Sequence, residues 1–187
     1  MTADLPIIRL RPKSKPQAIR HGFPWVFADE LVTDRRTKAI APGSFAVLVD
    51  AERLPLALVS VNPDSRIIAR VMDADPQTRI DRDWIAARQR RALAQRERLF
   101  DQPFYRLIHA EADGLPGTII DRFGDAAVIQ PNAAWAERLI GEIADALREV
   151  TGVSTVILNG QGRARGLEGL DERMEILSGA VGGPVEV

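Results

Sequence analysis

One short segment has the composition of a phosphate-binding loop. Residues 160–166 (GQGRARG) follow the apolar stretch 156–158, and in dinucleotide-binding folds glycines placed after a strand let a phosphate approach a helix N-terminus. The spacing G-x-G-x-x-x-G departs from the strict fingerprint, and the 21 residues after Gly166 are too few for the further strand and helix units of such a site. We interpret the segment as a turn-rich connection, with a cofactor loop as the alternative.

A second segment carries two neighbouring carboxylates. Glu111 and Asp113 lie in the sequence HAEADG, four residues or fewer from His109. On an extended backbone the two carboxylates would share one face and could act as an acid and base pair. In a turn, Asp113 would instead bind backbone N–H groups of the following Gly-Leu-Pro-Gly sequence. We favour this structural tie over a catalytic role.

The composition restricts the available chemistry. The chain has no cysteine, which excludes disulfides, thiolate metal sites and a thiol nucleophile within it. Its two histidines, His21 and His109, cannot build a histidine-based metal site without several carboxylates. We therefore assign no catalytic, cofactor-binding or metal-binding residue to this chain.

The charges divide unevenly along the sequence. Residues 1–106 hold 19 Lys and Arg against 13 Asp and Glu, a net charge of +6, whereas residues 107–187 hold 6 against 13, a net charge of −7. This asymmetry predicts a basic front part that meets a polyanion, or else two solvated surfaces of opposite sign. The long cationic side chains that suit phosphate contacts in the front part are Lys13, Lys15, Arg20, Arg35, Arg36 and Lys38, with Arg66 and Arg70 later. His21 could add a contact to a phosphate or a base, the alternative being a structural hydrogen bond.

The pattern of the first 75 residues predicts mostly strands. Apolar runs bounded by turn residues predict strands at 7–11, 44–50, 55–61 and 67–72, with a short helix at 17–20. The stretch 22–27 (GFPWVF) groups three aromatic residues around a proline, as in a buried corner or the start of a strand. Short strands at intervals of about ten residues are typical of a small barrel.

The pattern then changes. Residues 81–100 have apolar residues at helical spacing among many arginines, which predicts a basic helix joining two modules. A hairpin with its turn at Gly124, an amphipathic helix at 133–150 and a strand at 153–158 follow. This β-β-α-β order makes the second module α/β or α+β, and we predict an α+β chain with a small central α/β domain. Because neither a membrane-spanning run nor a signal peptide is evident, we expect a soluble, cytoplasmic protein.

Several motifs resemble one known family. Residues 105–108 (YRLI), 111–117 (EADGLPG) and 120–124 (IDRFG) closely resemble the central signature of the class I large-subunit ribosomal RNA methyltransferases of the cytosine-C5 type. Residues 22–27 and 68–71 (IARV) resemble the PUA domain that opens those proteins. Residues 168–170 match the family as well, whereas 159–165 depart from it.

The resemblance implies three regions: a PUA-like pseudo-barrel that binds RNA at 1–75, a helical linker at 76–102 and a small central domain at 103–187. In the family a further C-terminal domain holds S-adenosylmethionine and the catalytic cysteine, and this chain stops about where that domain would begin. We therefore expect no cofactor in this chain and no methyl transfer by it alone.

The resulting prediction is the RNA-recognition and central portion of a ribosomal RNA methyltransferase. Its partner would be structured, ribosomal RNA, with no membrane contact, and the chain could form a homodimer. The alternative is a docking module without RNA affinity of its own. The RNA-binding residues that we name are Lys13, Lys15, Arg20, His21, Arg35 and Arg36.

Overall fold

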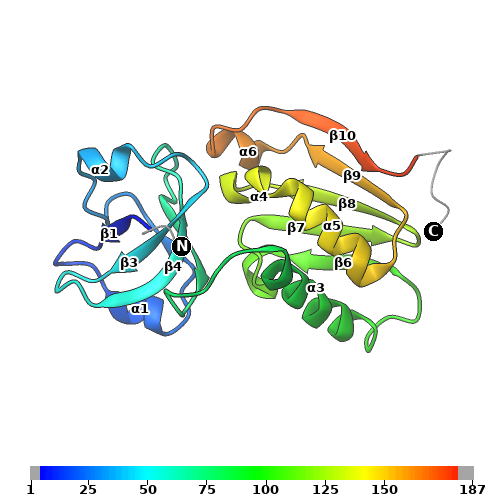
Figure 1. The fold of residues 1–187 in the computed structure, drawn as a ribbon, viewed down its shortest axis with the longest axis horizontal. Helices are drawn as coiled ribbons and strands as arrows, with labels where there is room; N and C mark the ends of the chain where they lie inside the picture. Colours follow the sequence, from blue (N-terminus) through cyan, green and yellow to red (C-terminus); the bar gives the residue numbers. More distant parts are fainter. Residues whose placement is uncertain (1–4, 181–187) are drawn as a thin grey trace. The chain divides into compact units, whose positions relative to one another are not determined.

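A computed structural model of the chain describes residues 5–180, and these form two compact units. The first unit comprises the described residues up to Thr78 together with Leu167–Gly169, and the second comprises Arg79–Gly166 and the described residues from Leu170 on. Each unit is built on its own five-stranded sheet with helices beside it (Figure 1). The predicted α+β class is confirmed.

The first unit has a curled, mainly antiparallel sheet with the strand order β1-β3-β4-β5-β2, in which the β1 and β3 pair is parallel. The predicted strands and short helix are all present, within a few residues of the predicted bounds. The elements are β1 (Ile7–Arg9), α1 (Pro16–Arg20), β2 (Trp25–Val26), α2 (Arg35–Lys38), β3 (Ser44–Val49), β4 (Pro55–Val61) and β5 (Ala69–Asp73).

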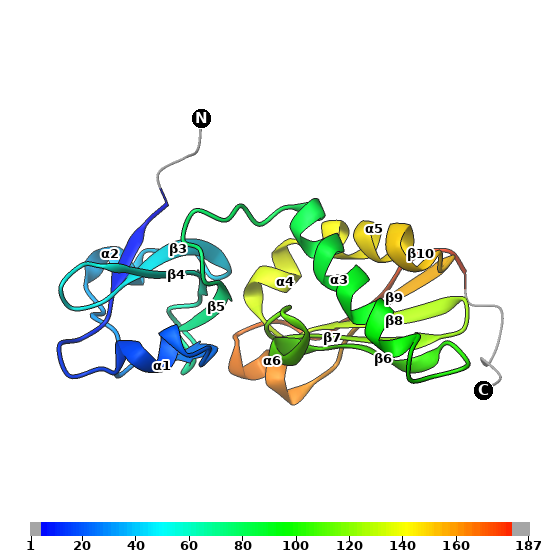
Figure 2. The same ribbon diagram turned by 90° about the horizontal axis from the view of Figure 1, so that it is seen from below.

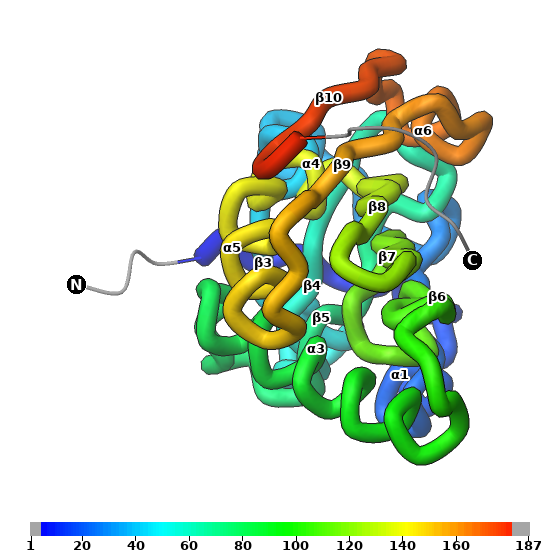
Figure 3. The backbone as a smooth tube through the Cα atoms, turned by 90° about the vertical axis from the view of Figure 1, so that its right-hand side faces the viewer, coloured from blue at the N-terminus to red at the C-terminus, as the bar shows by residue number. Residues whose placement is uncertain are grey.

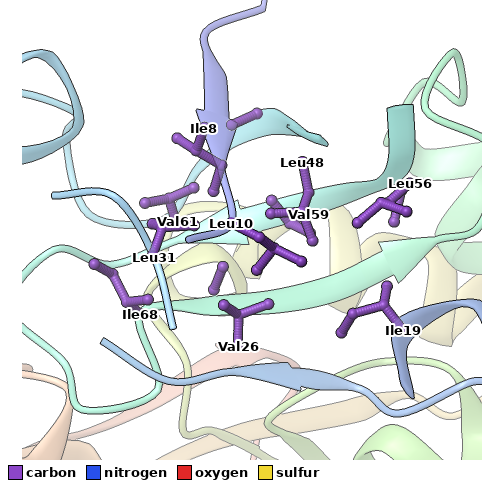
Figure 4. Close-up of a cluster of buried hydrophobic side chains, with 13 residues drawn as sticks. Ile8, Leu10, Ile19, Val26, Leu31, Leu48, Leu56, Val59, Val61 and Ile68 are labelled. Atoms are coloured by element: carbon purple, nitrogen blue, oxygen red, sulfur yellow. The ribbon is translucent and has the colours of Figure 1, made fainter. Parts of the chain in front are cut away.

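Alternation along the strands places the core of the first unit. Ala46 and Leu48 of β3 are fully buried while Val47 between them is not, because every second side chain of a strand points to the same face. In β4, Val59 and Val61 are fully buried within a strand that is buried on both faces. They join a cluster that also contains Ile8, Leu10, Ile19, Val26, Leu31, Leu56, Ala57, Ile68 and Ala69 (Figure 4). Burial stabilises a large apolar side chain by roughly 1.5–3 kcal/mol, so this cluster holds the surface segments of the unit on a packed base.

The second unit has the strand order β10-β9-β8-β7-β6, in which β8 and β9 are parallel and the other pairs antiparallel. The predicted hairpin, helix and following strand are present, but the predicted single helix at 133–150 is interrupted at Leu139. The elements are α3 (Arg82–Arg96), β6 (Phe104–His109), the 3-10 helix η1 (Ala110–Asp113), β7 (Thr118–Phe123), β8 (Ala126–Pro131), α4 (Ala134–Arg138), α5 (Ile140–Thr151), β9 (Thr155–Gly160), α6 (Arg163–Leu167) and β10 (Arg173–Ser178).

Helices α3, α4 and α5 cover one face of this second sheet (Figures 2 and 3). Trp84 of α3 and Trp135 of α4 meet edge to face, with ring centroids 6.5 Å apart, a favoured aromatic geometry. The indole Nε1 of Trp135 donates to the Pro116 carbonyl at 2.7 Å, and Gln89 Nε2 of α3 donates to the Ile143 carbonyl of α5. The predicted basic helix α3 therefore packs as part of the second unit.

No helix within residues 5–180 is both long and apolar enough to cross a membrane.

Candidate nucleic-acid interface

The basic residues predicted to bind RNA form two groups in the first unit. Lys13, Lys15, Arg20 and His21 lie in and beside α1, whereas Arg35 and Arg36 lie on α2. Helices α1 and α2 are on opposite sides of the curled sheet (Figures 1 and 2). The fold therefore brings four of the six residues together and holds the other two apart from them.

In the α1 group, the lysines and Arg20 differ in how they are held. Lys13 and Lys15 are exposed in the turn before α1. Arg20 Nη2 is 3.1 Å from Oδ2 of the buried Asp50, and the other carboxylate oxygen of Asp50 accepts the backbone N–H groups of Glu52 and Leu54. Arg20 is therefore oriented by the β3–β4 turn, with 37% of its side chain still exposed.

In the α2 group, Asp34 fixes the start of the helix. Its carboxylate accepts the backbone N–H of Thr37 at 2.8 Å, a typical N-cap interaction. This hydrogen bond, supported by the charge of Arg36, lowers the pKa of Asp34. Arg35 and Arg36 are both exposed on the helix, which leaves their guanidinium groups accessible to an anion.

The three aromatic residues of the stretch 23–27 form a ladder along one side of β2. Phe23 and Trp25 have ring centroids 6.2 Å apart, and Trp25 and Phe27 are 6.4 Å apart, both pairs edge to face. The predicted strand start is confirmed, but the corner is not fully buried, because Phe23 is 43% exposed and the other two rings are partly exposed. Alternate aromatic positions in the sequence are the signal for such a ladder.

An open hollow of about 510 Å³ adjoins the end of this ladder, lined by Phe27, Ala28, Asp29, Glu30 and Arg66. The sequence alone does not indicate this hollow, because Arg66 is distant in sequence from the other lining residues. The Ala28 N–H donates to the Arg66 carbonyl at 3.1 Å, which fixes the two segments side by side. The Glu30 carboxylate accepts the Phe27 backbone N–H at 2.9 Å and closes the turn from Phe27 to Glu30.

The basic turn before α1 is bonded to the rim of this hollow. Ser14 Oγ donates to the Glu30 carbonyl at 2.8 Å, and the Arg11 backbone N–H donates to the same oxygen. Arg11 Nε also donates to the Leu31 carbonyl. Lys13 and Lys15, which are both exposed, are the neighbours of Ser14 in the chain and so belong to the same turn.

Arg70, by contrast, is engaged inside the unit. Its Nη2 is 2.9 Å from Oε1 of Glu168, which also accepts the Ser65 hydroxyl at 2.8 Å. The second carboxylate oxygen accepts from Asn62 Nδ2 at 3.0 Å. Glu168 is 5% exposed and belongs to the short segment that completes the first unit. Its satisfied carboxylate is thus a structural feature.

Most of the charge asymmetry along the sequence is balanced within the second unit. Arg82 and Arg90 of α3 both pair with Glu149 of α5, and Arg96 pairs with Asp113. Arg106 makes a two-pronged contact with Asp121 on the neighbouring strand, which raises the pKa of Arg106. These basic residues from the front of the sequence therefore neutralise acidic residues from the back.

The glycine-containing segment 160–166 encloses a buried arginine. Arg165 is 1% exposed, and its guanidinium donates to the Pro131 and Asp171 carbonyls and to Glu137 Oε2 at 2.6–3.1 Å. A Cβ on Gly160 would lie 2.8 Å from the Arg173 carbonyl and 3.0 Å from Arg165 Nε. The glycine is needed there to make room for the guanidinium, which supports the interpretation as a structural connection.

The carboxylates at 111 and 113 do not form a catalytic pair. Asp113 Oδ2 accepts the His109 backbone N–H at 2.7 Å and pairs with Arg96 at 2.6 Å. It is a structural tie as favoured, although these partners lie before it in the chain rather than in the following glycine turn. Within residues 5–180, no group of three His, Cys, Asp or Glu residues is arranged to hold a metal ion.

Residues 8–74 match the family of PUA-like domains. This agrees with the curled sheet that the same residues form. The first unit contains a PUA-like domain.

The whole chain is similar to longer proteins. It is 33% identical over 174 residues to the ribosomal RNA large subunit methyltransferase I of Cronobacter sakazakii, covering 91% of this chain and 42% of that protein. It is 35% identical over 146 residues to a ribosomal RNA large subunit methyltransferase of Deinococcus radiodurans, covering 73% of this chain and 35% of that one. The chain thus spans about two fifths of the length of the curated relatives that it matches.

A solved structure from Streptococcus mutans, assigned as a SAM-dependent methyltransferase, superimposes with a TM-score of 0.71 at 11% identity, covering 83% of this chain and 40% of that one. A second methyltransferase structure, solved with SAH bound, has a TM-score of 0.68. At this identity the likeness establishes a shared fold.

Proposed function

We propose that this chain is the RNA-recognition and central portion of an S-adenosylmethionine-dependent ribosomal RNA methyltransferase. The observation that carries the proposal is the PUA-like domain, which presents the exposed Lys13 and Lys15 and a partly exposed aromatic ladder. The similarity to ribosomal RNA large subunit methyltransferases supports ribosomal RNA as the ligand. Resemblance to the cytosine-C5 branch supports cytosine as the base that the longer protein modifies.

In this proposal the first unit binds the RNA backbone. Lys13 and Lys15 contact phosphates directly, and Arg20, oriented by Asp50, contributes a third contact near His21. Arg35 and Arg36 on α2 form a second, separate contact point. Phosphate contacts position an RNA without reading its sequence, so these residues set affinity and orientation.

The test is fluorescence anisotropy of a labelled ribosomal RNA hairpin, titrated with the chain at several salt concentrations. The logarithm of the affinity should fall linearly with the logarithm of salt concentration. The triple variant Lys13→Ala, Lys15→Ala, Arg20→Ala should lower this slope by about one per lost phosphate contact. An unchanged slope would contradict the assignment of these residues. The paired variant Arg35→Ala, Arg36→Ala measures the second contact point separately.

We also propose that the chain alone transfers no methyl group and takes S-adenosylmethionine only as part of a longer protein. The family that it resembles attacks the base with a cysteine thiolate, and this sequence has no cysteine. Incubation with RNA and S-adenosylmethionine labelled in its methyl group should leave the RNA unlabelled. Labelled RNA would show the proposal to be wrong.

A docking role is the second candidate. It is favoured by the pairing of α3 arginines with acidic residues of the same unit, which leaves less basic surface for RNA than the sequence suggests. If the hairpin does not bind even at low salt, this role replaces the first. Sedimentation of the same samples tests whether the chain forms a homodimer.

A further inference from the structure

We infer that the hollow beside Phe27 receives one unpaired nucleobase of the bound RNA. The inference rests on the proposed RNA-binding function of the first unit and names the part of the RNA that this surface takes. Its volume of about 510 Å³ is within the range of about 300–1,000 Å³ typical of small-molecule sites. The lining residues, the ladder and the neighbouring charges each point to a base.

The aromatic ladder supplies the stacking surface. Phe27 is the last ring of the ladder and also lines the hollow, so its position is fixed by Trp25 on one side and by the turn to Glu30 on the other. Unpaired bases of RNA stack on aromatic rings and on arginine guanidinium planes. Phe27 and the exposed Arg66 offer both kinds of surface in one hollow.

The acidic residues of the lining favour a base over a phosphate. Asp29 and Glu30 both line the hollow, and two carboxylates repel a phosphate. Carboxylate oxygens accept hydrogen bonds from the exocyclic amino groups of bases, as from cytosine N4. Adenine, cytosine and guanine carry such a group, whereas uracil does not, so the hollow should disfavour uracil.

A basic turn is bonded to one of the residues that line the hollow. The turn that carries Lys13 and Lys15 is bonded to the Glu30 carbonyl through Ser14 and Arg11. A nucleotide whose base enters the hollow would therefore have its backbone beside two lysines. A base within a duplex is stacked and paired and cannot enter, so the occupant must lie in a loop, bulge or single-stranded end.

The experiment compares two labelled hairpins that share one stem and differ only in whether one loop nucleotide is abasic. The wild-type chain should bind the intact loop more tightly, by a factor of about 5 to 150, since stacking of one base contributes about 1–3 kcal/mol. Equal affinity for the intact and abasic loops would overturn the inference while leaving salt-dependent RNA binding in place. Binding of neither hairpin at low salt would overturn the proposed function and the inference with it.

Variants of Phe27 test the same contact from the protein side. Phe27→Leu keeps an apolar side chain and should lose at least about fivefold in affinity for the intact loop but not for the abasic loop, whereas Phe27→Trp should retain the preference. The control is Phe100→Leu in the second unit, where the ring is 47% exposed and pairs with Tyr105. An equal loss on both hairpins would show a structural role for Phe27 and contradict the inference.

A third arm tests base discrimination. With the loop nucleotide set in turn to each base, the wild-type chain should bind uracil most weakly, and Asp29→Asn should reduce that difference because the amide replaces one acceptor oxygen with a donor. If the difference between uracil and the other bases is as large in the Asp29 variant as in the wild type, Asp29 does not belong to the site.

Discussion

The two units use the same residue types in opposite ways. In the second unit, arginines pair with acidic residues on neighbouring elements, as Arg90 does with Glu149 and Arg96 with Asp113. In the first unit, two basic residues lie exposed in the turn before α1 and two lie exposed on α2. They are Lys13, Lys15, Arg35 and Arg36. These arginines of the second unit thus stabilise it, whereas in the first unit Arg20 and Arg70 are paired and these four basic residues remain accessible to an anion.

This difference shows that the number of charges in a sequence segment is a poor guide to where a polyanion binds. The arginine-rich helix α3 contributes strongly to the positive front half of the sequence. Its Arg88 lies over the Trp84 ring, with 3.3 Å between the guanidinium carbon and the ring centroid, a contact that orients the cation by cation–π attraction. The turn at 13–15, which has fewer basic residues than α3 but exposes both of them, is the better candidate for RNA.

The largest effect that we predict comes from the most buried of these cations. Arg165→Met should destabilise the second unit by about 3 kcal/mol, because it takes the buried donor from Glu137 Oε2 and from the Pro131 and Asp171 carbonyls, while Arg173 remains paired with Glu137 Oε1. Urea unfolding followed by tryptophan fluorescence, fitted with separate transitions for the two units, measures the loss. Arg163→Met, at an exposed position of the same helix, is the matched control. Equal stability of the two variants would show that Arg165 contributes no more than a surface residue.

The first unit contains the contrasting case of a buried anion. Glu168→Gln should destabilise this unit by about 2 kcal/mol, since hydrogen bonds to a charged group contribute about 1.5–3 kcal/mol and Arg70 would lose its counter-charge. The first-unit transition in urea should shift while the second stays in place. The control is Glu172→Gln, which alters an exposed carboxylate. A shift in neither transition would mean that Asn62 and Ser65 satisfy the amide as well as the acid.

The comparison between units is tested most directly on RNA. The double variant Arg82→Ala, Arg90→Ala removes two charges that are already paired with Glu149, so the salt slope of hairpin binding should stay as in the wild type. Stability should change by less than about 1 kcal/mol, because exposed ion pairs contribute little. A reduced salt slope would place α3 on the RNA and remove the distinction between the two units.

Local patterns were sufficient to predict the elements that have strong periodicity. Strand β4 begins and ends where the apolar run 55–61 does, and the turn of the predicted hairpin contains Gly124, at φ 61°. Two strands of the second unit were not predicted as such. β10 is an edge strand whose side chains are exposed or half-buried, so its sequence lacks the alternation of apolar and polar residues that a buried face produces. The residues of β6 were noted only as part of a family motif.

The sites depend on contacts that sequence order does not reveal. Arg66 meets Phe27, and Ser14 meets Glu30, only because the sheet brings their segments together. Likewise, no local pattern shows that Arg165 turns inward while Arg163, two residues earlier, stays exposed. Residue type was enough to propose phosphate contacts, but assigning a base to the hollow required the fold.

The smallest effect concerns an exposed carboxylate of the second unit. Asp125 accepts the Ser154 hydroxyl and the Ser154 backbone N–H, and these hydrogen bonds lower its pKa. A carboxylate whose pKa is lower in the folded state adds stability above its unfolded pKa of about 3.9, and this contribution is lost as the pH falls through the folded value. Wild type should therefore be more stable than Asp125→Asn at pH 7, and the difference should shrink as the pH is lowered from about 5 towards 2.

Urea midpoints of the second-unit transition across this pH range measure that difference. Ser154→Ala removes the hydroxyl donor but keeps the backbone N–H, so its pH dependence should lie between those of the wild type and the Asp125 variant. A difference that stays constant with pH would show that the contact acts through its shape and not through the charge of Asp125. Such a result would also separate this contact from the ion pairs of α3, whose contribution depends on charge at both partners.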